Sequence, residues 1–309
     1  MTGRVIQTTG SWYQVLAEGK VITCRLKGKF KLSDIDTTNP IAVGDFVVLE
    51  KTENGEFVIA EILPRENYII RQSPRQKHQR HILASNINQA ILVATVSKPR
   101  TSLGFIDRFI CSAASFHIPV VIIVNKVDLH TEKDNKQLEI MQQIYPEIGI
   151  PVLALSAQNP NDILQFHDLV QDKTSLIAGH SGVGKSTLLN ALNPDLNLKT
   201  GKISEKWNKG MHTTTFATMF EVFDNSYVID TPGIKEFATL HIEPEEVSGY
   251  FSEIKKYAES CQYNNCMHVQ EPNCAVIKAV EDGKIALTRY ENYLNILHDI
   301  NEVNYWERK

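Results

Sequence analysis

The sequence predicts a multidomain chain with a small N-terminal β-barrel, a central α/β domain and a C-terminal, mostly helical region that binds a metal ion. Short strand-like runs separated by turn residues occupy the first 65 positions. Continuous apolar runs then alternate with helical patterns, and three cysteines and a histidine cluster near the C-terminus. The expected boundaries are 1–65 for the barrel, 66–82 for a basic linker, 83–240 for the α/β domain and 241–309 for the helical metal-binding domain.

The composition is that of an ordinary globular protein. The chain has 309 residues, of which 42% are hydrophobic and 22% charged, and its net charge is -4. A mildly acidic chain can still bind nucleic acid where its basic residues are clustered. The N-terminus lacks a signal-peptide pattern, and the longest apolar run, residues 119–124, is far too short to span a bilayer. We therefore expect a cytoplasmic protein with no membrane attachment. We also expect a monomer.

The N-terminal region contains several short strand-like runs. They lie at residues 12–16, 21–26, 46–50 and 57–62. Four or five short strands suit a small closed barrel, because closure removes exposed sheet edges. An OB-fold is the leading prediction, and the spacing alone leaves an SH3-like barrel open.

A basic stretch follows the barrel. Its members are Arg65, Arg71, Arg75, Lys77, His78, Arg80 and His81. Two interpretations stay open: a solvated linker, or a strip that contacts phosphates.

The central region has the pattern of strands buried on both faces of a mostly parallel sheet. Expected strands lie at 88–94, 119–124, 151–155, 175–178 and 227–229, and helices near 103–116, 132–145 and 185–192. This pattern predicts a doubly wound α/β domain.

A phosphate-binding loop lies between the fourth of these strands and a helix. Its residues are Gly179, His180, Ser181, Gly182, Val183, Gly184, Lys185, Ser186 and Thr187. Glycines let backbone N–H groups surround phosphates at a helix N-terminus. We expect Lys185 to neutralise β- and γ-phosphate charge, and the Ser186 hydroxyl to bind Mg²⁺.

A second motif, Asp230-Thr231-Pro232-Gly233, follows the last strand. We expect Asp230 to hold Mg²⁺ through water and the Gly233 N–H to meet the γ-phosphate.

Base recognition is predicted at the ends of two other strands. Asn125-Lys126-Val127-Asp128 ends one, and the Asp128 carboxylate can accept from the two donors that guanine has and adenine lacks. The Lys126 stem can lie along the base, and Asn125 can brace the phosphate loop. Ser156-Ala157 follows the next strand and offers a backbone N–H to guanine O6.

The catalytic machinery is predicted only in part. Residues 210–215 lie where switch I must be, so Thr213 or Thr214 should complete the Mg²⁺ shell. Ile234 occupies the position where Ras-like GTPases carry the water-orienting glutamine, and it cannot orient water. Water must be positioned from elsewhere, for which His212 is one candidate and a partner another. The expected catalytic set is Lys185, His212, Thr213 and Thr214.

The C-terminal region carries Cys261-x4-Cys266-x-His268-x5-Cys274. Three thiolates and an imidazole form a closed tetrahedron around a structural zinc, with no position left for water. The remaining cysteines, Cys24 and Cys111, are expected to be buried thiols. An amphipathic helix is expected over roughly 284–306.

The order of the nucleotide motifs is circularly permuted, since Asn-Lys-x-Asp precedes the phosphate loop. This order, the barrel and the Cys/His cluster resemble the ribosome small-subunit-dependent GTPase A family, as do residues 210–214, 230–234 and 289–293. The resemblance implies a GTPase that binds the 30S subunit and 16S ribosomal RNA through its barrel and zinc domains. It also implies late small-subunit maturation, subunit-stimulated hydrolysis and release afterwards.

Two alternatives remain open at this point. One is a GTP-controlled binding module for a protein partner with little hydrolysis, which Ile234 leaves open. The other is a nucleic-acid-binding protein with a vestigial nucleotide site, which the intact Lys185, Ser186, Asp230 and Asp128 disfavour. The permutation also suggests that residues 230–233 are coupled directly to the C-terminal domain that follows them.

Overall fold

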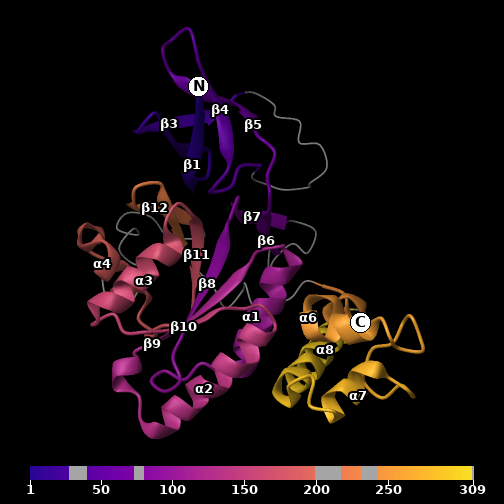
Figure 1. Ribbon diagram of the computed structural model, residues 1–309. Helices are drawn as coiled ribbons and strands as arrows, with labels where there is room; N and C mark the ends of the chain where they lie inside the picture. The colour runs from indigo at the N-terminus through magenta and orange to yellow at the C-terminus, as the bar shows by residue number, and fades with distance from the viewer. Residues whose placement is uncertain (28–39, 73–79, 199–216, 231–241, 308–309) are drawn as a thin grey trace.

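The computed structural model describes residues 1–27, 40–72, 80–198, 217–230 and 242–307. They form a barrel, an α/β domain and a helical domain (Figure 1). Among the helices in these ranges, none is both long and apolar enough to cross a membrane.

The N-terminal domain is a closed five-stranded barrel. Its strands are β1 (Thr2–Thr9), β2 (Trp12–Ala17), β3 (Lys20–Leu26), β4 (Phe46–Lys51) and β5 (Phe57–Ile62). Their order is β1-β2-β3-β5-β4, and β4 pairs back to β1. The β3–β5 pairing is parallel, which supports the OB-fold over the SH3-like alternative. Strand β1 was not among the predicted runs, because only Val5 of its buried residues is large and apolar.

The central domain contains a mostly parallel sheet. Its strands are β8 (Gln89–Ala94), β9 (Val120–Asn125), β10 (Val152–Leu155), β11 (Thr174–Ala178), β12 (Thr218–Phe223) and β13 (Ser226–Asp230). The order β10-β9-β8-β11-β13 is parallel throughout. The expected strands are confirmed, and their continuous apolar runs arise because helices cover both faces.

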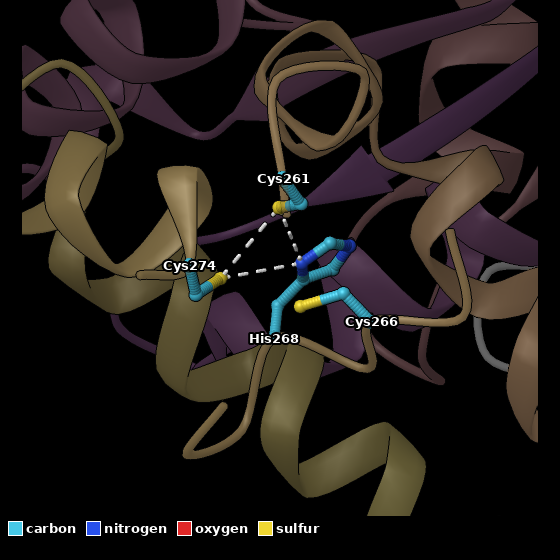
Figure 2. Close-up of side chains that lie close together, drawn as sticks. All are labelled: Cys261, Cys266, His268 and Cys274. Atoms are coloured by element: carbon cyan, nitrogen blue, oxygen red, sulfur yellow. Dashed lines mark hydrogen bonds between the residues drawn. The ribbon is translucent and has the colours of Figure 1, made fainter. Parts of the chain in front are cut away.

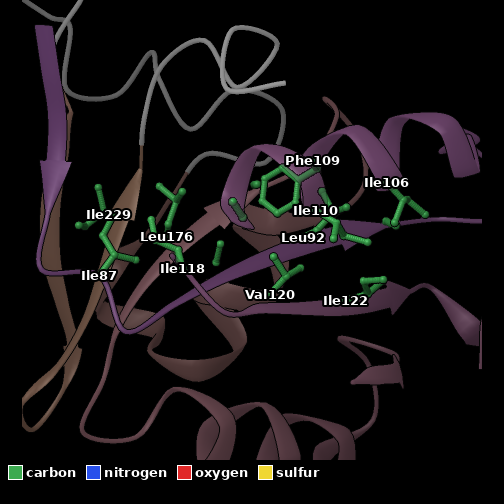
Figure 3. Close-up of a cluster of buried hydrophobic side chains, with 14 of the residues drawn as sticks. Ile87, Leu92, Ile106, Phe109, Ile110, Ile118, Val120, Ile122, Leu176 and Ile229 are labelled. Carbon is green, nitrogen blue, oxygen red and sulfur yellow. The ribbon is translucent and has the colours of Figure 1, made fainter. Parts of the chain in front are cut away.

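Helices flank this sheet. They are α1 (Leu103–Ser115), α2 (Glu132–Glu147), α3 (Pro160–Val170) and α4 (Lys185–Leu192), with 3-10 turns η1 (Val127–Leu129) and η2 (Pro194–Leu196). Helix α3 was not predicted, although Asn159 caps it and a proline opens it. The main core lies between α1 and the sheet, and it includes Phe109 of α1, Leu92 of β8 and Ile122 of β9 (Figure 3).

The barrel and the central sheet are continuous. Strand β12 pairs antiparallel with β13 and, through Gln7↔Thr218, with β1. Described strands therefore form one 11-stranded sheet that runs through both domains. Strand β12 was not expected here, since only Met219 and Val222 of its six residues are buried.

The predicted linker contains an antiparallel hairpin of β6 (Tyr68–Gln72) and β7 (Arg80–Ser85). Arg65, placed in the basic strip by sequence, is largely buried and bonds Asp45 through Nε (2.6 Å) and Nη2 (2.6 Å). This arginine therefore serves the fold and is not available as a phosphate contact. Residues 73–79, including Arg75, Lys77 and His78, lie outside the described residues.

The C-terminal domain is helical, as expected. It comprises η4 (Pro244–Tyr250), α6 (Ser252–Ala258), α7 (Ala275–Glu281) and α8 (Leu287–Glu307). Its core contains Val247, Phe251, Tyr293 and Ile296, together with Cys111 from α1. Both Cys111 and Cys24 are buried, as predicted. The domain is therefore packed against α1, beside which α8 lies in Figure 1.

Candidate nucleotide and metal sites

The phosphate loop connects β11 to α4, and its backbone requires glycine at two positions. Gly179 has φ 141°, and a Cβ there would lie 2.2 Å from the Val93 carbonyl oxygen. Gly184 has φ 97°, and a Cβ there would lie 2.3 Å from Asn125 Nδ2. Neighbouring chain therefore approaches this loop too closely for any side chain.

The charged end of Lys185 lies against its own loop. Its Nζ donates to the carbonyl oxygens of Gly179 (2.6 Å) and His180 (2.9 Å). Ser186, in the first turn of α4, is buried. The loop thus gathers a cation, a hydroxyl and the N-terminus of a helix, an arrangement that suits an anion such as phosphate.

The Asn-Lys-x-Asp segment is bonded to the phosphate loop, although the two are far apart in the chain. Asn125 Nδ2 donates to the Val183 carbonyl (2.8 Å), as the bracing prediction requires. Lys126 Nζ donates to the carbonyls of Gly182 (2.6 Å) and Lys98 (3.0 Å). These bonds fix one loop relative to the other.

Asp128 and Ser156 also meet. The Ser156 hydroxyl donates to Asp128 Oδ1 (2.6 Å), and the Ser156 N–H donates to Asp162 Oδ2 (2.7 Å). Asp162 was not predicted, although an acidic residue in the first turn of the helix after a strand was a signal for it. Ala157, the next residue after Ser156, is partly buried and packs against the hydrophobic core.

The permuted order leaves the site assembled because parallel neighbours end at the same sheet edge. The loops that follow β9, β10 and β11 carry the base motif, Ser156 and the phosphate loop, respectively. Asp230 ends β13 in register with Ile177 of β11, beside the start of that loop. The other predicted residues, His212, Thr213, Thr214, Gly233 and Ile234, lie outside the described residues.

The cysteine cluster has the geometry of a metal centre. All four ligand atoms of Cys261, Cys266, His268 and Cys274 lie within 4.8 Å of one another (Figure 2). A tetrahedral zinc with Zn–S of about 2.3 Å and Zn–N of about 2.0 Å separates two sulfurs by about 3.8 Å and a sulfur from a nitrogen by about 3.5 Å.

The three separations among Cys261, His268 and Cys274 are close to these values. Cys261 Sγ lies 3.9 Å from Cys274 Sγ and 3.6 Å from His268 Nδ1, and Cys274 Sγ lies 3.4 Å from the same nitrogen. Burial raises the pKa of the Cys266 thiol to about 12, so a metal that binds it must displace a proton. The residues present therefore fit a zinc ion.

Three further residues shape the metal loop and were missed by sequence reasoning. Tyr290 and Tyr293 of α8 donate their hydroxyls to the carbonyls of His268 (2.7 Å) and Met267 (2.7 Å). The Glu271 carboxylate accepts the N–H groups of Met267 (2.7 Å) and Val269 (2.8 Å). Two signals for them were available in the sequence: the Glu271 carboxylate lies between the predicted metal ligands, and Tyr290 and Tyr293 are three positions apart on a predicted helix.

Comparison with known proteins decides the family. The family described as RsgA GTPase matches residues 62–240, and the RsgA N-terminal domain matches residues 2–59. The chain belongs to the RsgA GTPase family. Membership makes it a GTP hydrolase with a circularly permuted GTPase domain, as the motif order predicted.

Individual RsgA-family relatives match nearly the whole chain. Proteins named Small ribosomal subunit biogenesis GTPase RsgA are 48% identical over 306 residues in Bacteroides fragilis (99% of each chain) and 45% identical in Flavobacterium psychrophilum (98% of this chain, 94% of the relative). YjeQ from Thermotoga maritima has a crystal structure with TM-score 0.79 and 35% identity (97% of this chain, 98% of that one). The structure of YloQ, a circularly permuted GTPase, has TM-score 0.74 and 30% identity (97% and 95%).

Proposed function

We propose that this chain binds the small ribosomal subunit through 16S rRNA and hydrolyses GTP to GDP and phosphate in late subunit maturation. Hydrolysis is stimulated by the subunit and drives release from it. The observation that supports this proposal best is that the phosphate loop, Asn125, Asp128 and Ser156 lie together at one edge of the sheet. The subunit as partner is supported by the name of the relatives, which are small ribosomal subunit biogenesis GTPases.

Base recognition in this proposal falls to Asp128, which Ser156 orients through their 2.6 Å hydrogen bond. Because the Ser156 N–H already donates to Asp162, we assign guanine O6 to the Ala157 N–H. The Asp128→Asn variant should move preference from guanine toward xanthine nucleotides, since an amide also donates. Unaltered discrimination between GTP and xanthosine triphosphate would remove Asp128 from the base site.

Phosphates are bound by residues 179–187, with Lys185 against the β- and γ-phosphates. Mg²⁺ is held by Ser186, by Asp230 and by Thr213 or Thr214, and the Gly233 N–H meets the γ-phosphate. Ile234 cannot orient the water, so we assign that role to His212. A His212→Ala variant with unchanged single-turnover hydrolysis and retained GTP affinity would contradict the assignment.

One structural zinc is assigned to Cys261, Cys266, His268 and Cys274. Four protein ligands close the coordination sphere, so the ion folds the segment and takes no part in hydrolysis. The barrel and this zinc domain are the proposed rRNA-binding parts of a monomeric protein.

The decisive experiment is GTP hydrolysis with and without purified 30S subunits. We expect strong stimulation by 30S and little by 50S subunits, with Lys185→Ala as the inactive control. Tight GTP binding without stimulation by 30S, 50S or RNA would instead favour a GTP-controlled binding module for a protein partner. No binding of GTP at all would remove the nucleotide site itself.

A further inference from the structure

Helix α1 touches the phosphate loop at its first turn. The Phe105 ring packs on the His180 ring, with centroids 4.1 Å apart and planes inclined by 35°. The carbonyl of His180 accepts one of the hydrogen bonds from Lys185 Nζ (2.9 Å). Phe105 therefore contacts His180, the residue whose carbonyl accepts a hydrogen bond from Lys185.

The next turn of the same helix is fastened to the C-terminal domain by buried charge. Asp107 is 1% exposed and accepts from Arg289 Nη1 (2.7 Å) and Asn292 Nδ2 (2.5 Å) of α8. It also accepts from the Tyr145 hydroxyl of α2 (2.9 Å). Arg289, itself 2% exposed, donates from Nε to Glu253 Oε1 (2.7 Å). One carboxylate thus joins α1, α2 and α8.

This junction is close-packed as well as charged. A Cβ at Gly104 would lie 3.2 Å from Asn292 Oδ1, so α8 approaches α1 where the helix lacks a side chain. The Arg289 guanidinium lies over the Phe251 ring, 4.4 Å from its centroid. Because a buried carboxylate is costly without its partners, Asp107 is favourable only while α8 is docked.

The same helix α8 supports the metal loop. Tyr290 and Tyr293 bond the carbonyls of His268 and Met267 within one turn of Arg289 and Asn292. Contacts therefore run from the Cys/His loop through α8 to Asp107, and the α1 helix itself connects Asp107 to Phe105, which contacts His180. This route does not depend on residues 231–241, which join the two domains along the chain.

We propose that Phe105 is a positioning residue for the phosphate loop, and that docking of α8 on Asp107 holds it there. The C-terminal domain then contributes to nucleotide binding without touching the nucleotide. The proposal rests on the nucleotide site proposed above. It adds that nucleotide affinity depends on the docking of α8, which the nucleotide site alone does not require. Disturbing the Asp107 junction weakens binding of the phosphates and leaves recognition of the base intact.

The test compares three single variants in the full-length, zinc-loaded chain. Phe105→Leu removes the contact with His180, and Asp107→Asn removes the charge that α8 neutralises. Phe116→Leu is the matched control, because Phe116 caps the other end of α1 and packs on the same core. Affinities for GDP and for inosine diphosphate, which lacks the 2-amino group, are measured by calorimetry well below the unfolding temperature of every variant.

We expect Phe105→Leu and Asp107→Asn each to weaken both nucleotides by roughly threefold to thirtyfold, the range for residues that act through a packed network. The ratio of GDP to inosine diphosphate affinity should stay that of the unmodified chain. The double variant should lose less than the product of the single losses, because both changes act along one route. Phe116→Leu should bind like the unmodified chain.

Other outcomes overturn the proposal in distinguishable ways. Equal affinities for Phe105→Leu and Phe116→Leu would remove Phe105 from phosphate-loop positioning. Weakened binding in Phe105→Leu but not in Asp107→Asn would remove the C-terminal domain from the route. A changed nucleotide ratio would mean that the effect reaches the base. Failure of the unmodified chain to bind GDP would be a failure of the nucleotide site and not of this coupling.

Discussion

The two ends of the chain are attached to the GTPase domain by different physical means. The barrel joins partly through backbone, because β1 pairs with β12 at Gln7↔Thr218 in one continuous sheet and the Ser85 N–H donates to the Val43 carbonyl. It joins partly through the Ser85 hydroxyl, which donates to Asp45. The C-terminal domain joins through side chains, chiefly the buried Asp107–Arg289–Glu253 set. Backbone pairing tolerates many side chains, whereas a buried charge network fails when one member is removed. The barrel attachment should therefore resist substitution better than the attachment of the C-terminal domain.

The largest effect is expected from Arg289→Met. This change leaves Asp107 and Glu253 buried without their cation, which costs about 3–5 kcal/mol of stability. Burial alone would lower the pKa of Arg289, but the two carboxylates outweigh it and hold the pKa above its usual value, so the guanidinium is charged. Hydrogen exchange should show loss of protection in α1 and α8.

Exchange in the barrel distinguishes local from global loss. If the attachments are independent, β1 to β5 keep their protection in Arg289→Met. Equal loss of exchange protection in the barrel and in the C-terminal domain would contradict the view that the two domains are attached independently. Lys284→Met is the matched control, since Lys284 is exposed and pairs only with exposed Asp282 among the described residues, and it should change nothing.

A smaller effect is expected from Asp45→Ala at the foot of the barrel. Asp45 is fully buried and accepts from Arg65, from the Ala42 N–H (2.8 Å) and from the Ser85 hydroxyl of the β6–β7 hairpin (2.6 Å). Losing these bonds should lower the free energy of unfolding by about 2–4 kcal/mol. The loss is limited because the Arg65 guanidinium, left without Asp45, is partly exposed and can be solvated by water. Thermal unfolding measures the loss, and exchange should locate it in β4 and the hairpin while α8 stays protected. Faster hydrogen exchange in α8 would argue against independent attachment of the barrel and the C-terminal domain.

The sequence predicted what depends on local pattern. The four side chains of the Cys/His cluster come from within fourteen residues, and each nucleotide motif follows its own apolar strand, so residue types and spacing indicated which side chains the fold brings together. The closed barrel followed from turn spacing. A contact of Asn125 with the phosphate loop was also predicted, and the structure places it at the Val183 carbonyl.

Long-range side-chain pairing escaped prediction for a physical reason. Asp107 and Arg289 are 182 positions apart, and nothing in either neighbourhood marks them as partners. Arg65 looked like a member of a basic strip because its partner Asp45 is 20 positions away. Charged residues are usually solvated, so a sequence pattern favours the surface until the fold brings an opposite charge to them.

The smallest effect is expected at the exposed edge of the α1–α8 contact, where Arg108 pairs with Asp299. Their side chains are 26% and 52% exposed, so solvent and salt screen the pair, which contributes about 0–1 kcal/mol. Exchanging the two residues, Arg108→Asp with Asp299→Arg, should restore whatever either single change removes. The measurement is thermal unfolding at low and high salt. A loss as large as that of Arg289→Met, unrecovered by the exchange, would mean that the rim of this contact, and not its buried centre, holds the C-terminal domain.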